Sequence, residues 1–510
     1  MRKIPRLMST QHPDNANVPE WINGEVIEGE WEVIEAYKAF SEYKLDEVMW
    51  DAEGKDVDTH VIRKLFSYYP EFFKENIIGQ DIFVTYRIPN PKIEKAERKV
   101  LSETLESITV SYDVAERFYG KNIVPIFEVI LPFTTSYEEL ISIIKYYEKA
   151  IVGRENVEVF NEIKVKDIVG EVNPKTIEII PLVEDKDSLL NIGKIIAGFW
   201  RHIKPKYLRV FIARSDPAMN YGLFSAVLLA KYALSEIYNI SKEISLDIFP
   251  IIGVGALPFR GNFNPENLEN ILNEYKGVVT FTVQSAFKYD YPKQEVLNAV
   301  EKIKNSRIED SYEFTHEERK ILQSMISKYS TRYQNEIELL GKLVNEVASL
   351  IPKRRARKLH IGLFGYSRET GKISLPRAIA FCGSLYSIGI PPEILGLNSL
   401  HELDENEWDL LNKSYLNFRK DLEQCSRFVN YEALDILQKD FRLNKEVIQM
   451  INEDVSYLEN QLGIKIGGRN YYERKHSYLS TLFLLALKEK NIEEAKLHIK
   501  QMAIIRKSIG

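Results

Sequence analysis

Seven short runs of β-branched and aromatic residues between about residues 45 and 285 constrain the fold of this chain more than any other feature. Each run precedes a loop and then a longer amphipathic stretch, which is the pattern of parallel strands joined by crossover helices. The expected strands are Glu47–Trp50, Ile82–Tyr86, Ile123–Val129, Thr176–Leu182, Tyr207–Ala213, Ser245–Ile252 and Val278–Val283, with Leu359–Phe364 as a candidate eighth. The expected helices between them include Tyr137–Ala150, Ser188–Arg201, Gly222–Ile237 and Pro292–Lys304.

Reactive side chains stand directly after most of these runs. They are Asp51, Glu53, Arg87, Glu184, Arg214, Asp216, Arg260 and Gln284. In a TIM (β/α)8 barrel the carboxyl ends of all strands converge on one face, so side chains far apart in the chain would share one pocket. An open doubly wound sheet would not gather all of them. We therefore predict an α/β fold of the TIM (β/α)8-barrel type.

The pattern changes after residue 300, where apolar residues recur at helical spacing and no convincing strand appears. The expected helical stretches are Thr315–Leu350, Glu405–Phe418, Tyr431–Leu462 and Ser477–Lys507. A chain of 510 residues, 45% of them hydrophobic, can bury a large core. We expect one catalytic unit, in which a barrel over residues 1–300 carries most of the active site. A mainly α-helical part over residues 301–510 would pack on the barrel and contribute a basic loop at 353–377.

Charge and cysteine content argue against several classes of protein. The formal net charge is −6 and the pI is near 5.9, which disfavours bulk attraction to nucleic acid or to an anionic membrane. Cys382 and Cys425 are the only cysteines, so neither a disulfide framework nor a multi-thiolate metal site is expected. No apolar run approaches the roughly 20 residues that a membrane span needs. The sequence favours a cytoplasmic protein with a small-molecule partner and with neither nucleic acid nor membrane as a partner.

One basic run, Lys353-Arg354-Arg355-Ala356-Arg357-Lys358, suggests phosphate-backbone binding at first sight. The run lacks interleaved aromatic residues, and the chain as a whole is acidic. We therefore prefer a loop that clamps a phosphate group or closes over an active site. A solvated helix end is the alternative interpretation.

The segment Met8-Ser9-Thr10-Gln11-His12-Pro13-Asp14-Asn15 concentrates functional groups near the start of the chain. His12 can move protons in either direction near neutral pH, and Pro13 fixes the backbone beside it. Asp14 and Asn15 favour a turn. The segment is therefore a candidate for proton-transfer chemistry, and a terminal tail with an incidental histidine is the alternative.

Two acidic residues, Glu184 and Asp216, stand at the tips of neighbouring predicted strands. A pair of carboxylates suits Mg²⁺ or Mn²⁺ when water and substrate oxygens fill the remaining coordination positions. The alternative is that each carboxylate caps the helix that follows it.

A glycine-punctuated loop, Gly253–Asn262, follows the sixth predicted strand. Its backbone amides could cradle an anion beside Arg260. A tight strand-to-helix turn with a surface arginine is the alternative.

In order along the chain, these segments resemble those of the short, archaeal-type phosphoenolpyruvate carboxylases. The matching segments are Ser9–Asn15, Tyr86–Pro91, Pro181–Glu184, Ser215–Ala218, Gly253–Asn262, Gln284–Tyr291 and Leu375–Ile379. Two positions depart from the long bacterial and plant form of the enzyme. That form has a lysine where this chain has Met219, and the first of two loop arginines where this chain has Val254.

The resemblance implies addition of bicarbonate to phosphoenolpyruvate, giving oxaloacetate and phosphate through carboxyphosphate and a metal-held enolate. It implies Mg²⁺ or Mn²⁺ bound by Glu184 and Asp216, and a homotetramer. Inhibition by aspartate or malate stays open. The implied catalytic residues are His12, Arg87, Arg260 and Arg377, and the implied substrate-binding residues are Gln284, Arg214, Arg354 and Arg355.

Two other functions fit part of the pattern. Another Mg²⁺-dependent barrel lyase or aldolase acting on pyruvate or its enol phosphate would share the carboxylates and arginines. Such an enzyme would need neither the His12 segment nor bicarbonate. A non-catalytic protein that binds an anionic metabolite would keep the barrel without turnover. Oxaloacetate formation that requires both a metal and bicarbonate would separate the first function from both alternatives.

Overall fold

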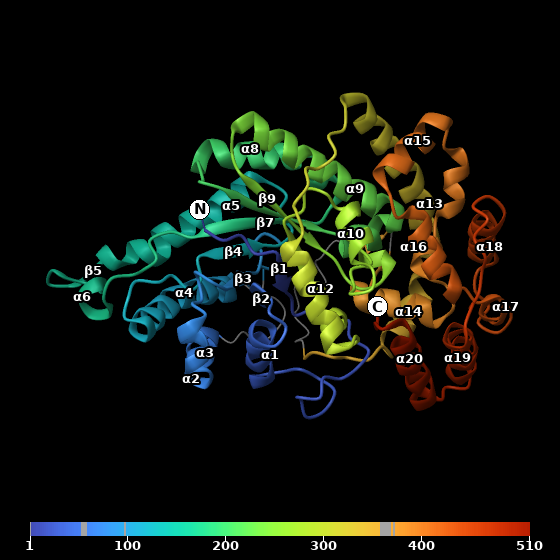
Figure 1. The fold of residues 1–510 in the computed structure, drawn as a ribbon, viewed down its shortest axis with the longest axis horizontal. Helices are drawn as coiled ribbons and strands as arrows, with labels where there is room; N and C mark the ends of the chain where they lie inside the picture. The colour runs from blue at the N-terminus through green and yellow to red at the C-terminus, as the bar shows by residue number, and fades with distance from the viewer. Residues whose placement is uncertain (1, 53–58, 96–97, 357–368, 371–372) are drawn as a thin grey trace.

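A closed parallel barrel forms the amino-terminal half of the molecule (Figure 1). The computed structural model describes residues 2–52, 59–95, 98–356, 369–370 and 373–510. The strands pair in the order β1-β10-β9-β8-β7-β4-β3-β2, which confirms the predicted TIM-type barrel. They are β1 (Leu7–Ser9), β2 (Glu47–Asp51), β3 (Phe83–Arg87), β4 (Glu128–Leu131), β7 (Glu178–Val183), β8 (Leu208–Ala213), β9 (Ile248–Gly253) and β10 (Thr280–Val283).

The eighth strand differs from the prediction. Leu7–Ser9 forms β1 and pairs in parallel with both β10 and β2, which closes the barrel. Leu7–Ser9 thus takes the eighth place in the barrel, and the candidate Leu359–Phe364 lies outside the described residues. A strand of three residues is too short to show a period of two in the sequence, so only its pairing on both sides identifies it.

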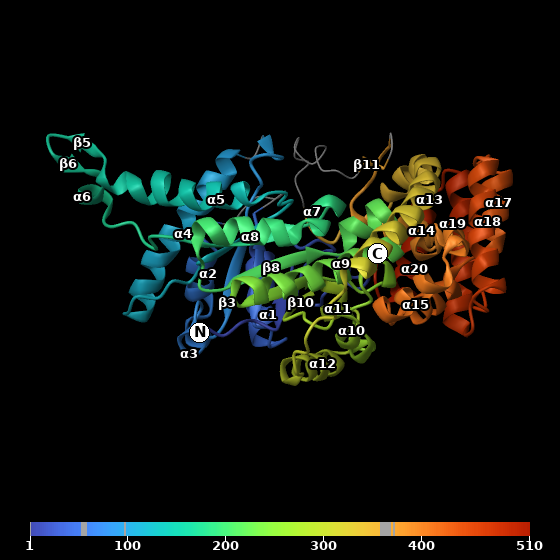
Figure 2. The same ribbon diagram turned by 90° about the horizontal axis from the view of Figure 1, so that it is seen from above.

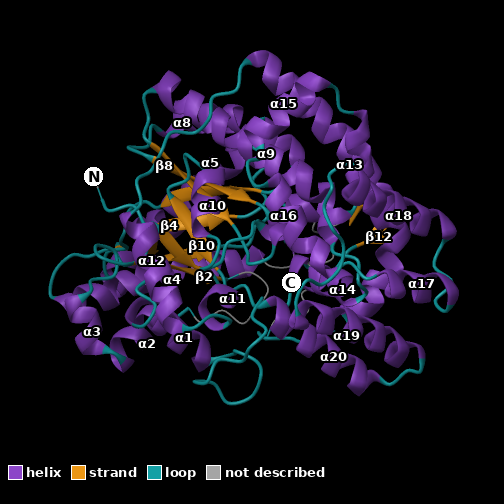
Figure 3. Cartoon of the chain, turned by 45° about the vertical axis from the view of Figure 1, so that its right-hand side comes forward, coloured by secondary structure: helices purple, strands orange, loops and turns teal. Residues whose placement is uncertain are grey.

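Helices connect the strands and surround the barrel, as Figure 3 shows in purple around the orange strands. They are α1 (Glu30–Ser41), α2 (Val61–Tyr68), α3 (Pro70–Glu75), α4 (Arg98–Tyr119), α5 (Tyr137–Tyr146), α7 (Lys186–Leu190), α8 (Ile192–Ile203), α9 (Ser215–Ile244), α10 (Leu268–Glu274), α11 (Ser285–Tyr289) and α12 (Lys293–Asn305). Their buried faces carry apolar residues at helical spacing, such as Ile192, Ile195, Ile196 and Phe199 on α8.

The remainder of the chain is mainly helical and packs against one side of the barrel (Figure 1). Its helices are α13 (His316–Ala348), α14 (Ala378–Ser387), α15 (Glu405–Ser414), α16 (Phe418–Cys425), α17 (Tyr431–Lys439), α18 (Lys445–Asn460), α19 (Tyr471–Lys488) and α20 (Ile492–Arg506). A two-stranded ribbon of β11 (Glu369–Thr370) and β12 (Ile373–Ser374) precedes α14. Across the described ranges no single helix is long and apolar enough to cross a membrane, although the bent pair Ala378–Ser387 and Pro392–Glu402 passes by length and composition.

The barrel and the helical part join where α9 packs on α13. Gly222 interrupts α9 with a φ of 82°, a conformation that side chains other than glycine rarely adopt. A Cβ there would lie 2.5 Å from the ring of Tyr329 and 2.9 Å from the ring of Tyr333, both on α13. The glycine therefore lets the helix bend and lets two buried tyrosines approach its backbone.

Two layers of side chains fill the barrel interior. At the amino end, the guanidinium of Arg209 binds Glu47 (2.7 and 2.8 Å), Glu128 (2.9 Å) and the hydroxyl of Thr280 (3.3 Å). Toward the carboxyl end the layer is apolar and consists of Met8, Met49, Ile130, Ile180, Leu182, Phe211, Ala213 and Ile251. Because side chains alternate along a strand, residues in register with these layers point to the barrel axis.

An arm projects away from the barrel at the end of the molecule opposite the helical part (Figure 2). It consists of β5 (Glu158–Phe160), antiparallel β6 (Ile163–Lys164) and the short helix α6 (Val165–Val169). The sequence patterns did not predict it.

Candidate active site

The His12 segment enters the site directly from the first barrel strand. Thr10 and Gln11 follow β1 and are buried, and His12 is half-buried at the carboxyl mouth of the barrel. The hydroxyl oxygen of Thr10 lies 2.9 Å from His12 Nδ1, within hydrogen-bond distance. The backbone of Ser285, at the start of α11, donates to the His12 carbonyl oxygen (3.2 Å). The segment is therefore built into the barrel and is not a tail.

Asp290 anchors the residues after His12. Its carboxylate accepts hydrogen bonds from the backbone N–H groups of Ala16 and Asn17, both at 2.7 Å. Burial raises the pKa of Asp290 to about 7, against the opposing effect of these hydrogen bonds. The carboxyl end of α11 thus fixes the far end of the His12 segment.

A cluster around Arg260 joins several strand ends. Arg260 is buried, and its Nη2 donates to Gln284 Oε1 (2.5 Å) while its Nε donates to Ser215 Oγ (3.1 Å). Its Nη1 lies 3.3 Å from Asp14 Oδ2 and donates to the carbonyl oxygen of Gly510 (2.6 Å). The structure therefore brings Arg260 and Gln284 together, and it surrounds the guanidinium with protein acceptors.

Asp14 is the acidic centre of the same cluster. Its Oδ1 accepts from the backbone N–H of Ala286 (2.7 Å), and its side chain is fully buried. Burial raises the pKa of the Asp14 carboxyl, and the positive charge of Arg260 opposes that rise. Asp14 therefore ties the His12 segment to both α11 and the loop after β9.

The last residues of the chain pack behind this cluster. The backbone N–H of Ile509 donates to the Asp14 carbonyl oxygen (2.7 Å), and the Ser508 hydroxyl donates to the same oxygen (3.1 Å). A Cβ at Gly510 would lie 2.0 Å from the carbonyl oxygen of Ile379, so the backbone leaves room for glycine alone. The helical part thus reaches the barrel mouth through its final residues.

The glycine loop after β9 differs from the expected anion cradle. The N–H of Gly255 donates to the Arg260 carbonyl (2.8 Å), and the N–H groups of Gly261 and Asn262 bond within the loop. A Cβ at Gly255 would lie 2.9 Å from Arg260 Cζ. The loop uses these three amides to fold around the arginine side chain, which favours the alternative of a tight turn, although Arg260 is buried and not at the surface.

Arg87 forms a two-point ion pair at the ends of β3 and β2. Its Nε and Nη2 donate to the two carboxylate oxygens of Asp51, at 2.9 and 2.7 Å. The Asp51 backbone N–H in turn donates to Gln11 Oε1 (3.0 Å). Such a two-point pair fixes the plane of the guanidinium. Arg87 thus lies at the mouth on the same side as the His12 segment.

Glu184 and Asp216 follow β7 and β8, which are neighbours in the barrel. Glu184 is buried, and its Oε2 accepts from the backbone N–H of Phe133 (2.9 Å), which orients the carboxylate. Neither residue is the N-cap of the following helix, because Asp185 caps α7 and Arg214 precedes α9.

Two carboxylates are a suitable donor set for a hard cation. Within the described ranges no group of three or more His, Cys, Asp or Glu could hold a metal ion. A pair of carboxylates that leaves most positions to water and substrate oxygens fits Mg²⁺ or Mn²⁺, whereas sites with three or four protein ligands suit zinc. The residues present therefore fit the expected cation.

Arg214 points away from the barrel axis. Ala213 belongs to the interior layer, so the next side chain along the strand faces outward. Its Nε donates to the hydroxyl of Tyr275 (2.8 Å) beside α10. Burial raises the pKa of Asp421, and the positive charge of Arg214 opposes that rise. The contact ties the guanidinium of Arg214 to Tyr275, and the structure gives no support to the predicted role of Arg214 in binding substrate at the mouth.

Arg354 and Arg355 hold protein groups. Arg355 is buried and pairs with Glu32 (2.9 Å) and Glu35 on α1. Arg354 donates to the carbonyl oxygen of Ala16 (2.8 Å) and to Glu25 Oε2 (3.0 Å). We therefore correct the assignment of both from substrate binding to fixing α1 and the His12 segment. The rest of the expected lid lies largely outside the described residues.

Arg377 is the N-cap residue of α14 and is half-buried. Its position follows the β11–β12 ribbon. The side chains that the structure links by direct contacts at the mouth are thus Asp14, Ser215, Arg260 and Gln284, with Arg87 and Asp51 on the neighbouring strands.

Sequence reasoning placed Asp51 at a strand end without giving it a role, treated Asp14 only as a turn former, and missed the final residues as parts of the site. Strand alternation carried one usable signal. Arg87 is in register with Thr85, whose hydroxyl binds the interior Glu47, whereas Arg214 is out of register with Ala213. Successive side chains of a strand alternate between the barrel interior and the exterior. From the interior positions, this alternation predicts that Arg87 faces the interior and that Arg214 faces the exterior. No comparable signal marked Gly510.

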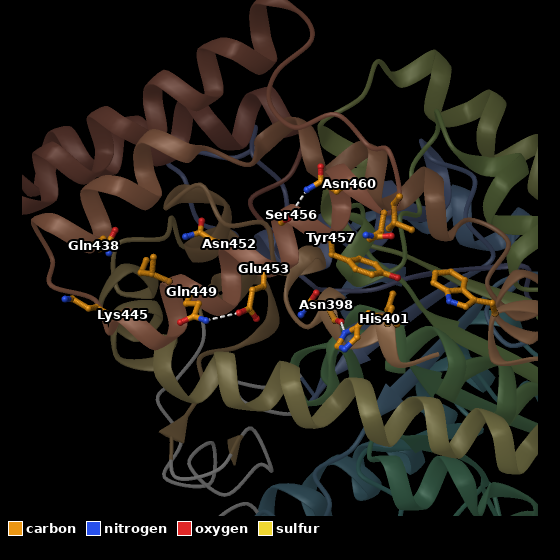
Figure 4. Close-up of a pocket in the computed structure, with 15 residues that line it drawn as sticks. Asn398, His401, Gln438, Lys445, Gln449, Asn452, Glu453, Ser456, Tyr457 and Asn460 are labelled. Atoms are coloured by element: carbon orange, nitrogen blue, oxygen red, sulfur yellow. Dashed lines mark hydrogen bonds between the residues drawn. The ribbon is translucent and has the colours of Figure 1, made fainter. Parts of the chain in front are cut away.

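A separate cavity of about 1130 Å³ lies in the helical part (Figure 4). Polar residues of α18 line it, including Gln449, Asn452 and Glu453, together with Asn398 and His401. None of the predicted site residues lines this cavity. The barrel mouth is therefore the candidate site, because the reactive side chains gather there.

Comparison with known proteins gives one consistent result. Residues 4–510 match the family model described as phosphoenolpyruvate carboxylase. A phosphoenolpyruvate carboxylase of Metallosphaera sedula is 57% identical over 510 residues, which cover 100% of both chains. Proteins of the same name from Picrophilus torridus (51% over 509 residues, 99% of each chain) and Caldivirga maquilingensis (50% over 513 residues, 100% of each chain) are also similar.

Proposed function

The chain belongs to the archaeal-type, short-form phosphoenolpyruvate carboxylase family, and from that premise we propose that it adds bicarbonate to phosphoenolpyruvate to form oxaloacetate and phosphate. The observation that carries the proposal is the His12 segment, which continues a barrel strand into the mouth beside Arg87. A barrel lyase or aldolase without bicarbonate chemistry would not need that segment. A protein that only binds metabolites would not need a proton-transfer residue there.

Charge neutralisation is the main demand of this reaction. Phosphoenolpyruvate carries a phosphate and a carboxylate, and an enolate remains when bicarbonate has attacked phosphorus and carboxyphosphate has formed. We assign Arg87 and Arg377 to the anionic groups of the substrates, because a planar guanidinium binds phosphate and carboxylate by two hydrogen bonds. Asp51 would hold the Arg87 guanidinium in the plane that such binding requires.

Arg260 has a different role in this proposal. Its guanidinium is occupied by Asp14, Ser215, Gln284 and Gly510, so we assign it to positioning. It would hold the His12 segment and the Gln284 side chain in their places at the mouth. Gln284 would then be free to present its amide nitrogen to a substrate oxygen.

His12 would accept the proton of carboxyphosphate as that intermediate breaks into carbon dioxide and phosphate. The carbon of the enolate then attacks carbon dioxide, and the new carbon–carbon bond gives oxaloacetate. Thr10 Oγ1 lies 2.9 Å from Nδ1 and orients the ring, and we assign the proton transfer to Nε2. Pro13 and the anchored Asp14 would keep the ring at the mouth during this step.

Glu184 and Asp216 would hold Mg²⁺ or Mn²⁺. When bound, the cation supplies positive charge for the enolate oxygen as negative charge develops there. The Phe133 N–H fixes one oxygen of Glu184, so that the carboxylate is oriented before the cation arrives.

We further infer that residues 1–300 and 301–510 act as one catalytic unit, since Asp14 and Arg260 both bond to the last residues of the chain. We place the enzyme in the cytoplasm as a homotetramer. Exposed apolar side chains on the arm and on α19 support an assembled state.

The test is the product distribution of His12→Asn. Asparagine keeps a similar size but cannot accept the proton, so attack of bicarbonate on phosphorus should continue while carboxylation fails. We expect phosphate and pyruvate to form in a bicarbonate-dependent reaction with little oxaloacetate. Oxaloacetate, pyruvate and phosphate are measured separately in the presence of Mg²⁺.

The matched control is His202→Asn on α8, where the ring stacks on Tyr137 away from the mouth. It should keep the wild-type product distribution. A wild-type protein that forms no oxaloacetate from phosphoenolpyruvate, bicarbonate and Mg²⁺ would defeat the proposed function. A His12→Asn variant with normal oxaloacetate formation would defeat the role of His12 alone.

A further inference from the structure

The arm exposes apolar side chains that the chain itself does not cover. Phe160 is 67% exposed and Ile168 is 64% exposed, and Val157, Val159, Ile163 and Val169 are also exposed. A two-stranded ribbon with so little packing has marginal stability alone. Several exposed apolar side chains within one short segment indicate an interaction site. The arm, defined as residues 157–171, therefore needs a partner surface.

The arm also carries an excess of negative charge. Its acidic residues are Glu158, Glu162, Asp167 and Glu171, and its basic residues are Lys164 and Lys166. None of these six side chains forms a salt bridge to another described residue. An anionic membrane surface would repel this charge, so a positively charged protein surface is the better partner.

One helix of the same chain presents a complementary surface. Tyr471, Tyr478, Leu482 and Leu485 on α19 are all exposed, Tyr471 by 71% and Tyr478 by 67%. Their spacing of seven, four and three residues puts them on one face of the helix. Arg474 and Lys475 lie on that face and are exposed, and neither pairs with a described acidic side chain. We call these six residues the α19 face.

The two surfaces cannot meet within one chain. The arm lies at one end of the long axis of the molecule and α19 lies toward the other end, in both views (Figures 1 and 2). Two copies related by a two-fold axis and lying antiparallel would bring each arm to the α19 face of the other copy. Such a pair is closed and makes the same contact twice, which leaves neither surface exposed.

We propose that the arm of one copy binds the α19 face of a second copy, in a two-fold antiparallel pair. The apolar side chains of the arm pack between Tyr471, Tyr478 and Leu482, and its carboxylates lie against Arg474 and Lys475. The inference rests on the proposed function in one respect, which is that the protein assembles as a homotetramer. This contact would be one of the two-fold interfaces of that tetramer. It does not depend on the reaction.

Cross-linking of engineered cysteines tests the contact directly. Both native cysteines are buried, and burial raises the pKa of each thiol, so they do not compete for a thiol reagent. We expect the double variant Phe160→Cys/Tyr478→Cys to form a covalent dimer with a short bis-maleimide. The single variants should remain monomers on a denaturing gel. A dimer from Phe160→Cys alone would indicate an arm-to-arm contact and overturn the proposal, and so would no dimer from the double variant.

Charge reversal provides a second, independent test on the full-length protein. Glu158→Lys/Glu162→Lys on the arm, or Arg474→Glu/Lys475→Glu on α19, should each weaken association about tenfold, measured by sedimentation velocity. The protein with all four substitutions should regain most of the association, because the charges are again opposite. Failure of that recovery would overturn the pairing of these two surfaces.

A matched control is Ile308→Asp, which changes an exposed apolar residue outside both surfaces. It should leave the sedimentation coefficient unchanged. The outcomes also separate this inference from the proposed function. A monomeric wild-type protein that forms oxaloacetate defeats only the interface, whereas a cross-linked pair that forms none defeats only the reaction.

Discussion

At the scale of single residues, the barrel mouth depends on side chains that are held by several partners at once. Arg260 has four acceptors around it, and Asp14 bonds through its side chain and its backbone. A buried guanidinium with such fixed partners cannot be replaced by a point charge without leaving acceptors unpaired. Two kinds of substitution therefore test the site. One kind removes a charge, and the other keeps the charge but removes the hydrogen-bonding shape of the side chain.

Removing the charge of either proposed metal ligand should abolish turnover. Glu184→Gln and Asp216→Asn keep the side-chain shape but lose a negative charge, and we expect more than ~100-fold loss of oxaloacetate formation. Metal binding, followed by isothermal titration calorimetry with Mn²⁺, should weaken in parallel. The matched control is Asp185→Asn, which alters the N-cap of α7 and should cost only about 1 kcal/mol of stability. Unchanged Mn²⁺ affinity in Glu184→Gln or Asp216→Asn would remove that residue from the metal site.

Arginine-to-lysine substitutions should separate positioning from substrate contact. Arg377→Lys should raise the KM for phosphoenolpyruvate, since an ammonium cannot make the two-point contact of a guanidinium. Arg260→Lys should instead lower kcat and disturb the bicarbonate dependence more, because it releases Asp14 and Gln284. Steady-state kinetics with each substrate varied would measure the difference. Identical effects of the two variants on both substrates would contradict the separate roles.

At the scale of secondary-structure elements, the amino end of the barrel is closed by buried charge. Arg209 lies on β8 and joins Glu47 of β2 to Glu128 of β4, with side chains that are almost fully shielded from solvent. Removing one partner of a buried ion pair leaves an uncompensated charge, which costs far more than the pair contributes. The guanidinium of Arg209 therefore joins three strands, and Glu128 also pairs with Arg2.

Arg209→Leu should destabilise the protein by about 3–5 kcal/mol, because Glu47 would remain buried without its cation. The free energy of unfolding is measured by denaturation in urea. The control Arg154→Leu removes an exposed pair with Glu106 and should cost less than about 1 kcal/mol. If both variants lose a similarly small amount of unfolding free energy, then water or a rearranged side chain replaces Arg209.

At the scale of the whole molecule, the barrel and the helical part meet through buried acids. Asp421 on α16 accepts hydrogen bonds from Asn262 Nδ2 (2.7 Å) in the β9 loop and from the Tyr415 hydroxyl (2.7 Å). Glu393 accepts from the backbone N–H of Phe259 (2.9 Å) in the same loop. Burial raises the pKa of each carboxyl to about 7.

This junction should weaken as pH rises toward 7. A carboxyl whose pKa is raised in the folded state binds its proton more tightly there than in the unfolded chain. Its contribution to stability is complete below about pH 4 and is lost as pH rises through the folded pKa of about 7. Asp421→Asn mimics the protonated form, so the stability of the wild type relative to this variant should fall between about pH 4 and 7 and level off above pH 7. The slope should be at most about 1.4 kcal/mol per pH unit.

Thermal and urea unfolding of both proteins across that range measures the difference. Lys439→Gln, which alters an exposed ion pair with Asp435 on α17, serves as the control and should show no such slope. A difference between wild type and Asp421→Asn that is constant with pH would mean that the carboxyl titrates outside this window.

The class of fold, the approximate positions of seven barrel strands, the helical second part and the family could all be predicted from the sequence. Those conclusions rest on local information, because strand alternation, helical spacing and the residues after each strand are all read within short windows. The same local information placed Glu184, Asp216, Arg87 and Gln284 at strand ends. It missed the three-residue β1, which carries His12 into the site.

The contacts of each charged side chain could not be predicted from the sequence, because they depend on the three-dimensional fold. Arg209 binds Glu47 from 162 residues away, Arg260 binds Gly510 from 250 residues away, and Arg355 binds Glu35 from 320 residues away. No short window contains both partners of such a pair. From the sequence alone, an arginine could bind either a substrate anion or a buried carboxylate of the protein. Which of the two a charged side chain binds depends on the direction in which it points. That direction is set when the barrel closes and the helices pack around it.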